Sequence, residues 1–83
     1  MKLKDIIRNL DVIECTVDIG IEISGISYDS RATQPGDMFV AVKGFESDGH
    51  RFIPKAMQNG AVVVLCEDAP SDGTPYVLSL IHI

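Results

Sequence analysis

The chain has 83 residues, 46% of them hydrophobic, and its seven basic and twelve acidic residues give a formal net charge of -5. This length allows one domain at most, and the hydrophobic content argues against disorder. The basic residues form no stripe, which excludes a typical nucleic-acid interface, although backbone N–H groups could still hold an anionic ligand.

Targeting and metal-binding signals are missing from the sequence. No stretch has the apolar length of a signal peptide or of a membrane span, so we expect a cytoplasmic protein that does not contact a membrane. Cys15 and Cys66 lie far apart; a disulfide between them is conceivable, but buried thiols in a reducing compartment are the favoured interpretation. No cluster of cysteines and histidines has metal-ligand spacing, so no metal is expected.

The first expected element is a short helix over residues 2–10. Its apolar residues recur at i, i+3, i+4 and i+7, and so share one helix face: Leu3, Ile6, Ile7 and Leu10. Residues 12–20 show no clear pattern. Residues 21–28 alternate apolar and polar side chains as a half-buried strand does, and the loop that follows, residues 29–37, contains a Pro-Gly turn.

The second half of the chain predicts an α/β fold. The continuous apolar run at 38–42 reads as a buried strand, and strands are also expected at 61–66 and 76–80. Between them, residues 50–59 form a predicted helix with a glycine stop at Gly60 and with apolar residues at helical spacing: Phe52, Ile53, Ala56 and Met57. We therefore expect a small mixed sheet with flanking helices, in which this helix is a right-handed crossover between strands covered on both faces.

Two loops that bracket strand 38–42 carry the candidate ligand groups. Ser30 offers a hydroxyl and Arg31 a planar fork suited to phosphate or carboxylate. The competing interpretation is structural: Asp29 would cap the turn, Arg31 would pair with Asp29 or Asp37, and His50 would open the helix at 50–59. No phosphate loop and no nucleophilic triad is found, so no catalytic residue is expected in this chain.

The ordered motifs of the chain resemble the N-terminal, UDP-binding domain of the Mur ligase family. The similarity covers about residues 1–75, and four segments carry it: Asp29-Ser30-Arg31, Pro35-Gly36-Asp37-Met38-Phe39-Val40-Ala41, Lys43-Gly44-Phe45 and Asp48-Gly49-His50. The serine after Asp29 and the Gly44-Phe45 loop favour the tripeptide-synthetase branch of the family over the branch that adds D-alanyl-D-alanine.

The resemblance implies a binding site for the uridine diphosphate end of a UDP-N-acetylmuramoyl-peptide. It places Tyr28 and Ser30 in a first contact loop, and Phe45, Glu46 and Ser47 in a second. Ser30 would hydrogen-bond the nucleotide, while Tyr28 and Phe45 would supply apolar or stacking surface near the uracil. Glu46 is expected to make backbone contact only, and Arg31 to organise its loop.

The resemblance also implies that residues 1–83 are one piece of a larger enzyme. Family members continue with a central ATP-binding domain and a C-terminal domain, where ATP and magnesium act; this chain would need no cofactor of its own. The residues from Leu78 onward depart from the family pattern, which suggests a truncated or misjoined reading frame. Two interpretations compete with a ligase piece: a stand-alone α/β ligand-binding module, and a non-functional fragment.

Overall fold

The computed structural model of the chain describes residues 1–41 and 49–79. The described part contains a mixed sheet with the strand order β1-β5-β4-β3-β2, in which neighbours from β2 to β5 are parallel and β1 is antiparallel to β5. Its elements, in chain order, are α1 (Leu3–Ile7), β1 (Val12–Cys15), β2 (Ile26–Ser27), η1 (Ser30–Ala32), β3 (Met38–Val40), η2 (Gly49–Phe52), α2 (Ile53–Gln58), β4 (Val63–Cys66) and β5 (Tyr76–Ser79). The predicted α/β class with a small mixed sheet is confirmed.

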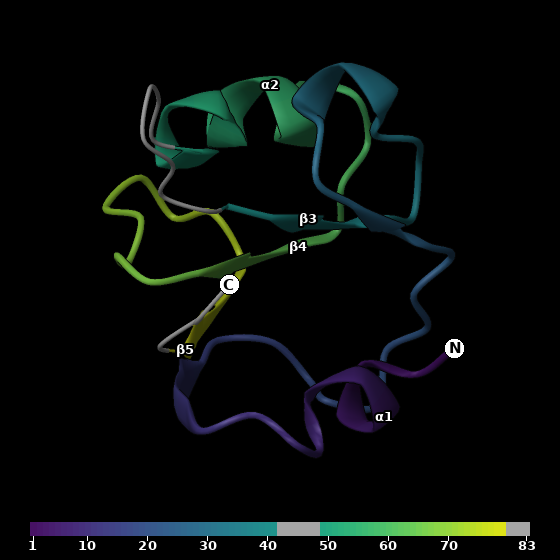
Figure 1. Cartoon of the computed structure of the whole chain (residues 1–83), viewed down its shortest axis with the longest axis vertical. Coiled ribbons are helices and arrows are strands. Elements are labelled where there is room, and N and C mark those ends of the chain that lie inside the picture. The colour runs from purple at the N-terminus through teal and green to yellow at the C-terminus, as the bar shows by residue number, and fades with distance from the viewer. Residues whose placement is uncertain (42–48, 80–83) are drawn as a thin grey trace.

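Helices cover both faces of the sheet, α2 on one face and α1 on the other (Figure 1). Side chains of successive strand residues point to opposite faces, so β3 and β4 contribute to two separate cores. Met38, Val40, Val63, Leu65 and Val77 pack with α1, whereas Phe39, Ala41, Val64 and Cys66 pack with α2. The prediction that the central strands are covered on both faces is thus confirmed.

The segment from β3 through α2 to β4 links two parallel neighbours, as predicted. Met38 pairs with Val63 and Val40 with Leu65. Gly60 follows the end of α2 with a φ of 107°, and a Cβ at this position would lie 2.7 Å from the Cα of Pro35. Only glycine combines this backbone conformation with such a close approach, which confirms Gly60 as the helix stop.

The N-terminal third departs from the sequence prediction. The helix ends at Ile7 instead of residue 10, and Leu10 is 36% exposed because the chain turns there toward β1. The strand expected at 21–28 is reduced to Ile26–Ser27, since the backbone of residues 21–23 pairs with the N-terminal residues instead: Leu3 N–H donates to the Ile21 carbonyl, and Ile23 N–H to that of Met1.

Strand β1 lies in a segment for which the sequence predicted no element. It is an edge strand with Val12, Ile13 and Glu14 exposed, so it lacks the alternation that marks a half-buried strand. The remaining boundaries agree within a few residues, and the predicted helix at 50–59 consists of a 3-10 turn, η2, followed by α2. Residues 42 and 80, the predicted ends of two strands, lie outside the described part of the chain.

Both cysteines are free thiols. Cys66 is fully buried, as expected, whereas Cys15 is only partly buried. In residues 1–41 and 49–79, no helix has the length and apolar character needed to cross a membrane.

Candidate functional site

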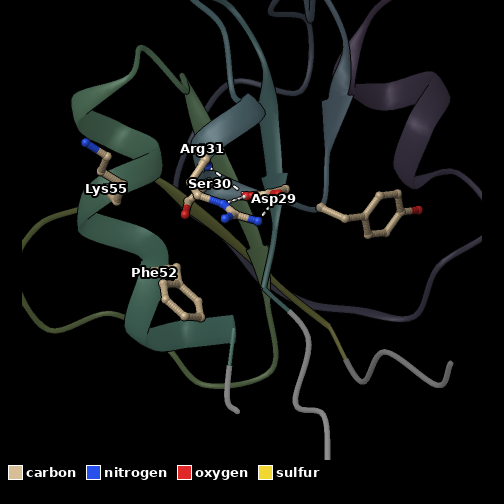
Figure 2. Close-up of a pocket in the computed structure, with 6 residues that line it drawn as sticks. Asp29, Ser30, Arg31, Phe52 and Lys55 are labelled. Carbon is tan, nitrogen blue, oxygen red and sulfur yellow. Dashed lines mark hydrogen bonds and ion pairs between the residues drawn. The ribbon is translucent and has the colours of Figure 1, made fainter. Parts of the chain in front are cut away.

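A cavity of about 540 Å³ lies beside the carboxyl ends of the parallel strands. It is lined by Tyr28, Asp29, Ser30, Arg31, Phe52 and Lys55 (Figure 2). The first four residues directly follow β2, and the last two lie on the η2–α2 segment, which precedes β4. Loops at strand ends are where α/β domains commonly place their ligand-binding groups.

The loop after β2, which forms one side of the cavity, is held in shape by hydrogen bonds between its own residues. The Asp29 carboxylate accepts from the Arg31 backbone N–H at 2.9 Å and so caps η1. The hydroxyls of Ser27 and Thr33 both donate to the Asp29 carbonyl, at 2.7 and 3.1 Å. These bonds satisfy the backbone of a tight turn and fix the direction of the residues between them.

Among the described residues, one long-range hydrogen bond joins the two sides of the cavity. The side-chain amide of Asn59, at the end of α2, donates to the Ser30 carbonyl at 2.8 Å. The bond is partly buried and bridges 29 residues of sequence. It therefore holds η1 against α2.

Ser30, a predicted ligand-binding residue, is 6% exposed, yet its hydroxyl makes no hydrogen bond with any described residue. Fully buried side-chain oxygen and nitrogen atoms in the described part of the chain all have partners, so the Ser30 oxygen must be reachable from the cavity that it lines. A buried residue that leaves its polar atom unused toward a cavity can bind a ligand there without first breaking a protein contact.

Arg31 and Asp29 bind each other rather than pointing freely into the cavity (Figure 2). Arg31 Nε lies 3.2 Å from Asp29 Oδ1, and Nη2 lies 3.0 Å from Oδ2. These hydrogen bonds lower the pKa of Asp29 and raise the pKa of Arg31. The structural interpretation of both residues is confirmed, and Asp37 instead accepts from the backbone N–H of Gln34.

The other predicted contact residues divide into two groups. Tyr28 lines the cavity and is 70% exposed, so its ring is available to a ligand. Phe45, Glu46 and Ser47, the expected second loop, lie outside the described residues.

Phe52 and Lys55 were not identified from the sequence as lining residues. Phe52 is one of the apolar residues at helical spacing in the predicted helix, but Ile53 and Ala56 are the ones buried in the core. Phe52 remains 38% exposed, and the Arg51 guanidinium lies 5.4 Å from the centre of its ring. In the sequence, the i, i+3 spacing of Phe52 and Lys55 could have indicated that both residues lie on the helix face opposite Ile53 and Ala56.

His50 lies in η2, just before α2, which agrees with the prediction that it opens the helix. Its Nε2 also accepts from the backbone N–H groups of Glu67 and Asp68, at 3.0 and 3.1 Å. Since Nε2 accepts, the ring in this arrangement is protonated on Nδ1. His50 thus supports the loop that follows β4.

The fold is that of an α/β domain with a five-stranded mixed sheet, and its cavity lies beside the ends of the parallel strands. A family model described as "Mur ligase family, catalytic domain" matches residues 22–80. The chain therefore belongs to the Mur ligase family, which confirms the resemblance seen in its motifs.

Two relatives and one solved structure illustrate the similarity. UDP-N-acetylmuramoyl-L-alanyl-D-glutamate--2,6-diaminopimelate ligase of Phocaeicola vulgatus is 51% identical over 70 residues, 84% of this chain and 14% of that protein. The ligase of the same name from Syntrophomonas wolfei is 49% identical over 67 residues, 81% of this chain and 14% of that protein.

The solved structure is UDP-N-acetylmuramoylalanyl-D-glutamyl-2,6-diaminopimelate--D-alanyl-D-alanyl ligase from Acinetobacter baumannii. It matches with a TM-score of 0.63 and 32% identity over 69% of this chain and 13% of that one. The chain thus spans about 14% of the length of the curated relatives described above.

Proposed function

We propose that this chain binds the uridine diphosphate end of UDP-N-acetylmuramoyl-L-alanyl-D-glutamate, as the N-terminal domain of a ligase that adds a diamino acid to this substrate. The names of the two relatives support the substrate and point to 2,6-diaminopimelate as the diamino acid. One structural observation carries the proposal: the Ser30 hydroxyl is held in a cavity at the carboxyl edge of the sheet with no described protein partner.

In this proposal Ser30 hydrogen-bonds the nucleotide, and Tyr28 offers its exposed ring to the uracil. Phe45, Glu46 and Ser47 remain the proposed second contact loop. Asp29 and Arg31 shape the first loop and do not bind the substrate themselves.

The chemistry of such a ligase would take place on other domains. There ATP would phosphorylate the terminal carboxylate of the substrate, and the amine of the diamino acid would displace the phosphate. The contribution of this chain is to hold the substrate by a handle far from the reacting carboxylate, so that binding energy gained there positions the reacting group. We place this work in the cytoplasm, with the central ATP-binding and C-terminal domains as partners.

A second candidate is the related ligase that adds D-alanyl-D-alanine. The structural similarity to the Acinetobacter baumannii ligase, at 32% identity, favours it. The higher identity to the 2,6-diaminopimelate ligases, 51% and 49%, makes it the weaker of the two.

The test is a titration of the chain with UDP, followed by NMR chemical shifts. We expect affinity on the order of millimolar to tens of micromolar, because only the nucleotide end of the substrate is held. Perturbed shifts should cluster at residues 28–31, and Ser30→Ala should weaken binding by about 1 kcal/mol, the usual contribution of one hydrogen bond.

Ser71→Ala, which removes an exposed hydroxyl from the loop between β4 and β5, is the matched control and should bind UDP like the unmodified chain. Unchanged binding by Ser30→Ala, or shifts that cluster away from residues 28–31, would show that the site is wrongly assigned.

A further inference from the structure

Among the described residues that line the cavity, the positive and negative charges do not balance. Three of its lining side chains are charged: Asp29, Arg31 and Lys55. Asp29 and Arg31 neutralise each other through two side-chain hydrogen bonds, whereas Lys55 makes no ion pair or hydrogen bond with any described residue. The described part of the lining therefore carries one net positive charge, in a chain whose formal net charge is -5.

The packing of α2 against the sheet determines on which face of the helix Lys55 lies. Its neighbours Ile53 and Ala56 are buried in the core between α2 and the sheet, so the opposite face of the helix carries Lys55. The Asn59 bond to the Ser30 carbonyl holds this helix against η1. Lys55 and Phe52 line the cavity from the η2–α2 segment, and Ser30 lines it from η1. In Figure 2 the Lys55 ammonium points away from Ser30, so its flexible stem has to turn toward the cavity to reach a ligand there.

Of the two cations, Lys55 is the better phosphate ligand in this arrangement. For Arg31 to bind a phosphate, it would have to give up its bonds to Asp29 and leave that carboxylate beside the incoming anion. Lys55 has three N–H donors on a flexible stem and loses no described protein contact when it binds.

We propose that Lys55 contacts the diphosphate of the bound nucleotide and thereby makes the cavity selective for a nucleoside diphosphate over the uncharged nucleoside. This inference rests on the proposed function, and it adds a specificity-determining residue on the wall opposite Ser30.

The experiment compares the affinities of UDP and uridine for the unmodified chain, Lys55→Gln and Lys55→Arg by NMR titration. Lys55→Gln should weaken UDP binding roughly fivefold, the effect of losing one partly screened charge-assisted contact, and should leave uridine binding unchanged. Lys55→Arg should retain most of the UDP affinity. Raising the salt concentration should weaken UDP binding less in Lys55→Gln than in the unmodified chain.

Lys4→Gln is the matched control, because it removes the same charge from α1, on the other face of the sheet (Figure 1). It should bind UDP like the unmodified chain. If Lys4→Gln weakens UDP binding as much as Lys55→Gln, the effect reflects overall charge and the inference is wrong.

The remaining outcomes separate the inference from the function on which it rests. Unchanged UDP binding by Lys55→Gln, together with weakened binding by Ser30→Ala, would overturn the role of Lys55 alone. Failure of the unmodified chain to bind UDP at millimolar concentration would overturn the proposed function as well.

Discussion

Ser30 and Cys66 are both buried, but their polar atoms face different surroundings. The Ser30 oxygen is reachable from a cavity, whereas the Cys66 thiol lies inside the core beneath α2, with Sγ 3.7 Å from the Val77 carbonyl. Burial and, secondarily, the nearby Asp68 carboxylate raise the pKa of Cys66 to about 11. Burial of a residue thus does not by itself decide whether its polar atom is accessible.

At the scale of single residues, we predict that Cys66 reacts slowly with thiol reagents in the folded chain. With a pKa of about 11, only about one thiol in a thousand is ionised at pH 8, and the reactive species is the thiolate. A colorimetric disulfide reagent at pH 8 should therefore report one rapidly reacting thiol, Cys15, and a second only after urea is added.

The control is Cys15→Ser, which should leave no rapidly reacting thiol in the folded chain. Two fast equivalents in the unmodified protein, or a fast equivalent in this variant, would contradict the prediction.

At the scale of elements, the cavity depends on the contact between η1 and α2. The two elements come from different parts of the chain and are joined by the bond from Asn59 to the Ser30 carbonyl. Gly60 adds to the same junction, because its backbone lies against Pro35 and its carbonyl accepts from the Gly36 N–H. The position of Ser30 is thus set by the end of a helix that follows it by almost thirty residues.

We therefore predict that Asn59→Ala lowers the free energy of unfolding by about 1 kcal/mol, since it removes one partly buried hydrogen bond. It should also weaken UDP binding, although Asn59 does not line the cavity. Urea denaturation and the UDP titration measure the two effects.

Gln58→Ala, an exposed truncation one residue earlier on the same helix, is the matched control and should change neither quantity appreciably. Equal stability of the two variants would mean that the Asn59 bond does not stabilise the junction.

At the scale of the whole molecule, the sequence predicts that this chain does not bind ATP. Its sequence contains no Gly-x-x-x-x-Gly-Lys-Ser/Thr loop, the element that cradles nucleotide phosphates in ATP-binding domains of that type. We predict that isothermal titration with Mg-ATP gives no binding in the micromolar range, while UDP still perturbs residues 28–31. Micromolar binding of Mg-ATP would contradict this prediction.

The sequence by itself was sufficient for the family and for the central elements. The apolar run of β3, the helix ending at Gly60 and the run of β4 were predicted because each is a local signal: continuous burial, helical spacing and a glycine stop. The ordered motifs around Asp29-Ser30-Arg31 likewise identified the Mur ligase family, and the loop that they mark lines the cavity. Such features depend only on residues close together in the chain.

Only the tertiary structure decided the rest, because the rest depends on partners far apart in sequence. Edge strand β1 forms by pairing with β5, about sixty residues away, and its exposed side chains leave no alternating pattern to detect. Whether Phe52 packs in the core or faces the cavity depends on how α2 lies on the sheet. The pairing of Arg31 with Asp29 rather than Asp37 follows from three-dimensional contacts that residue types alone do not specify. The same is true of Lys55, which lines the cavity without a partner among the described residues.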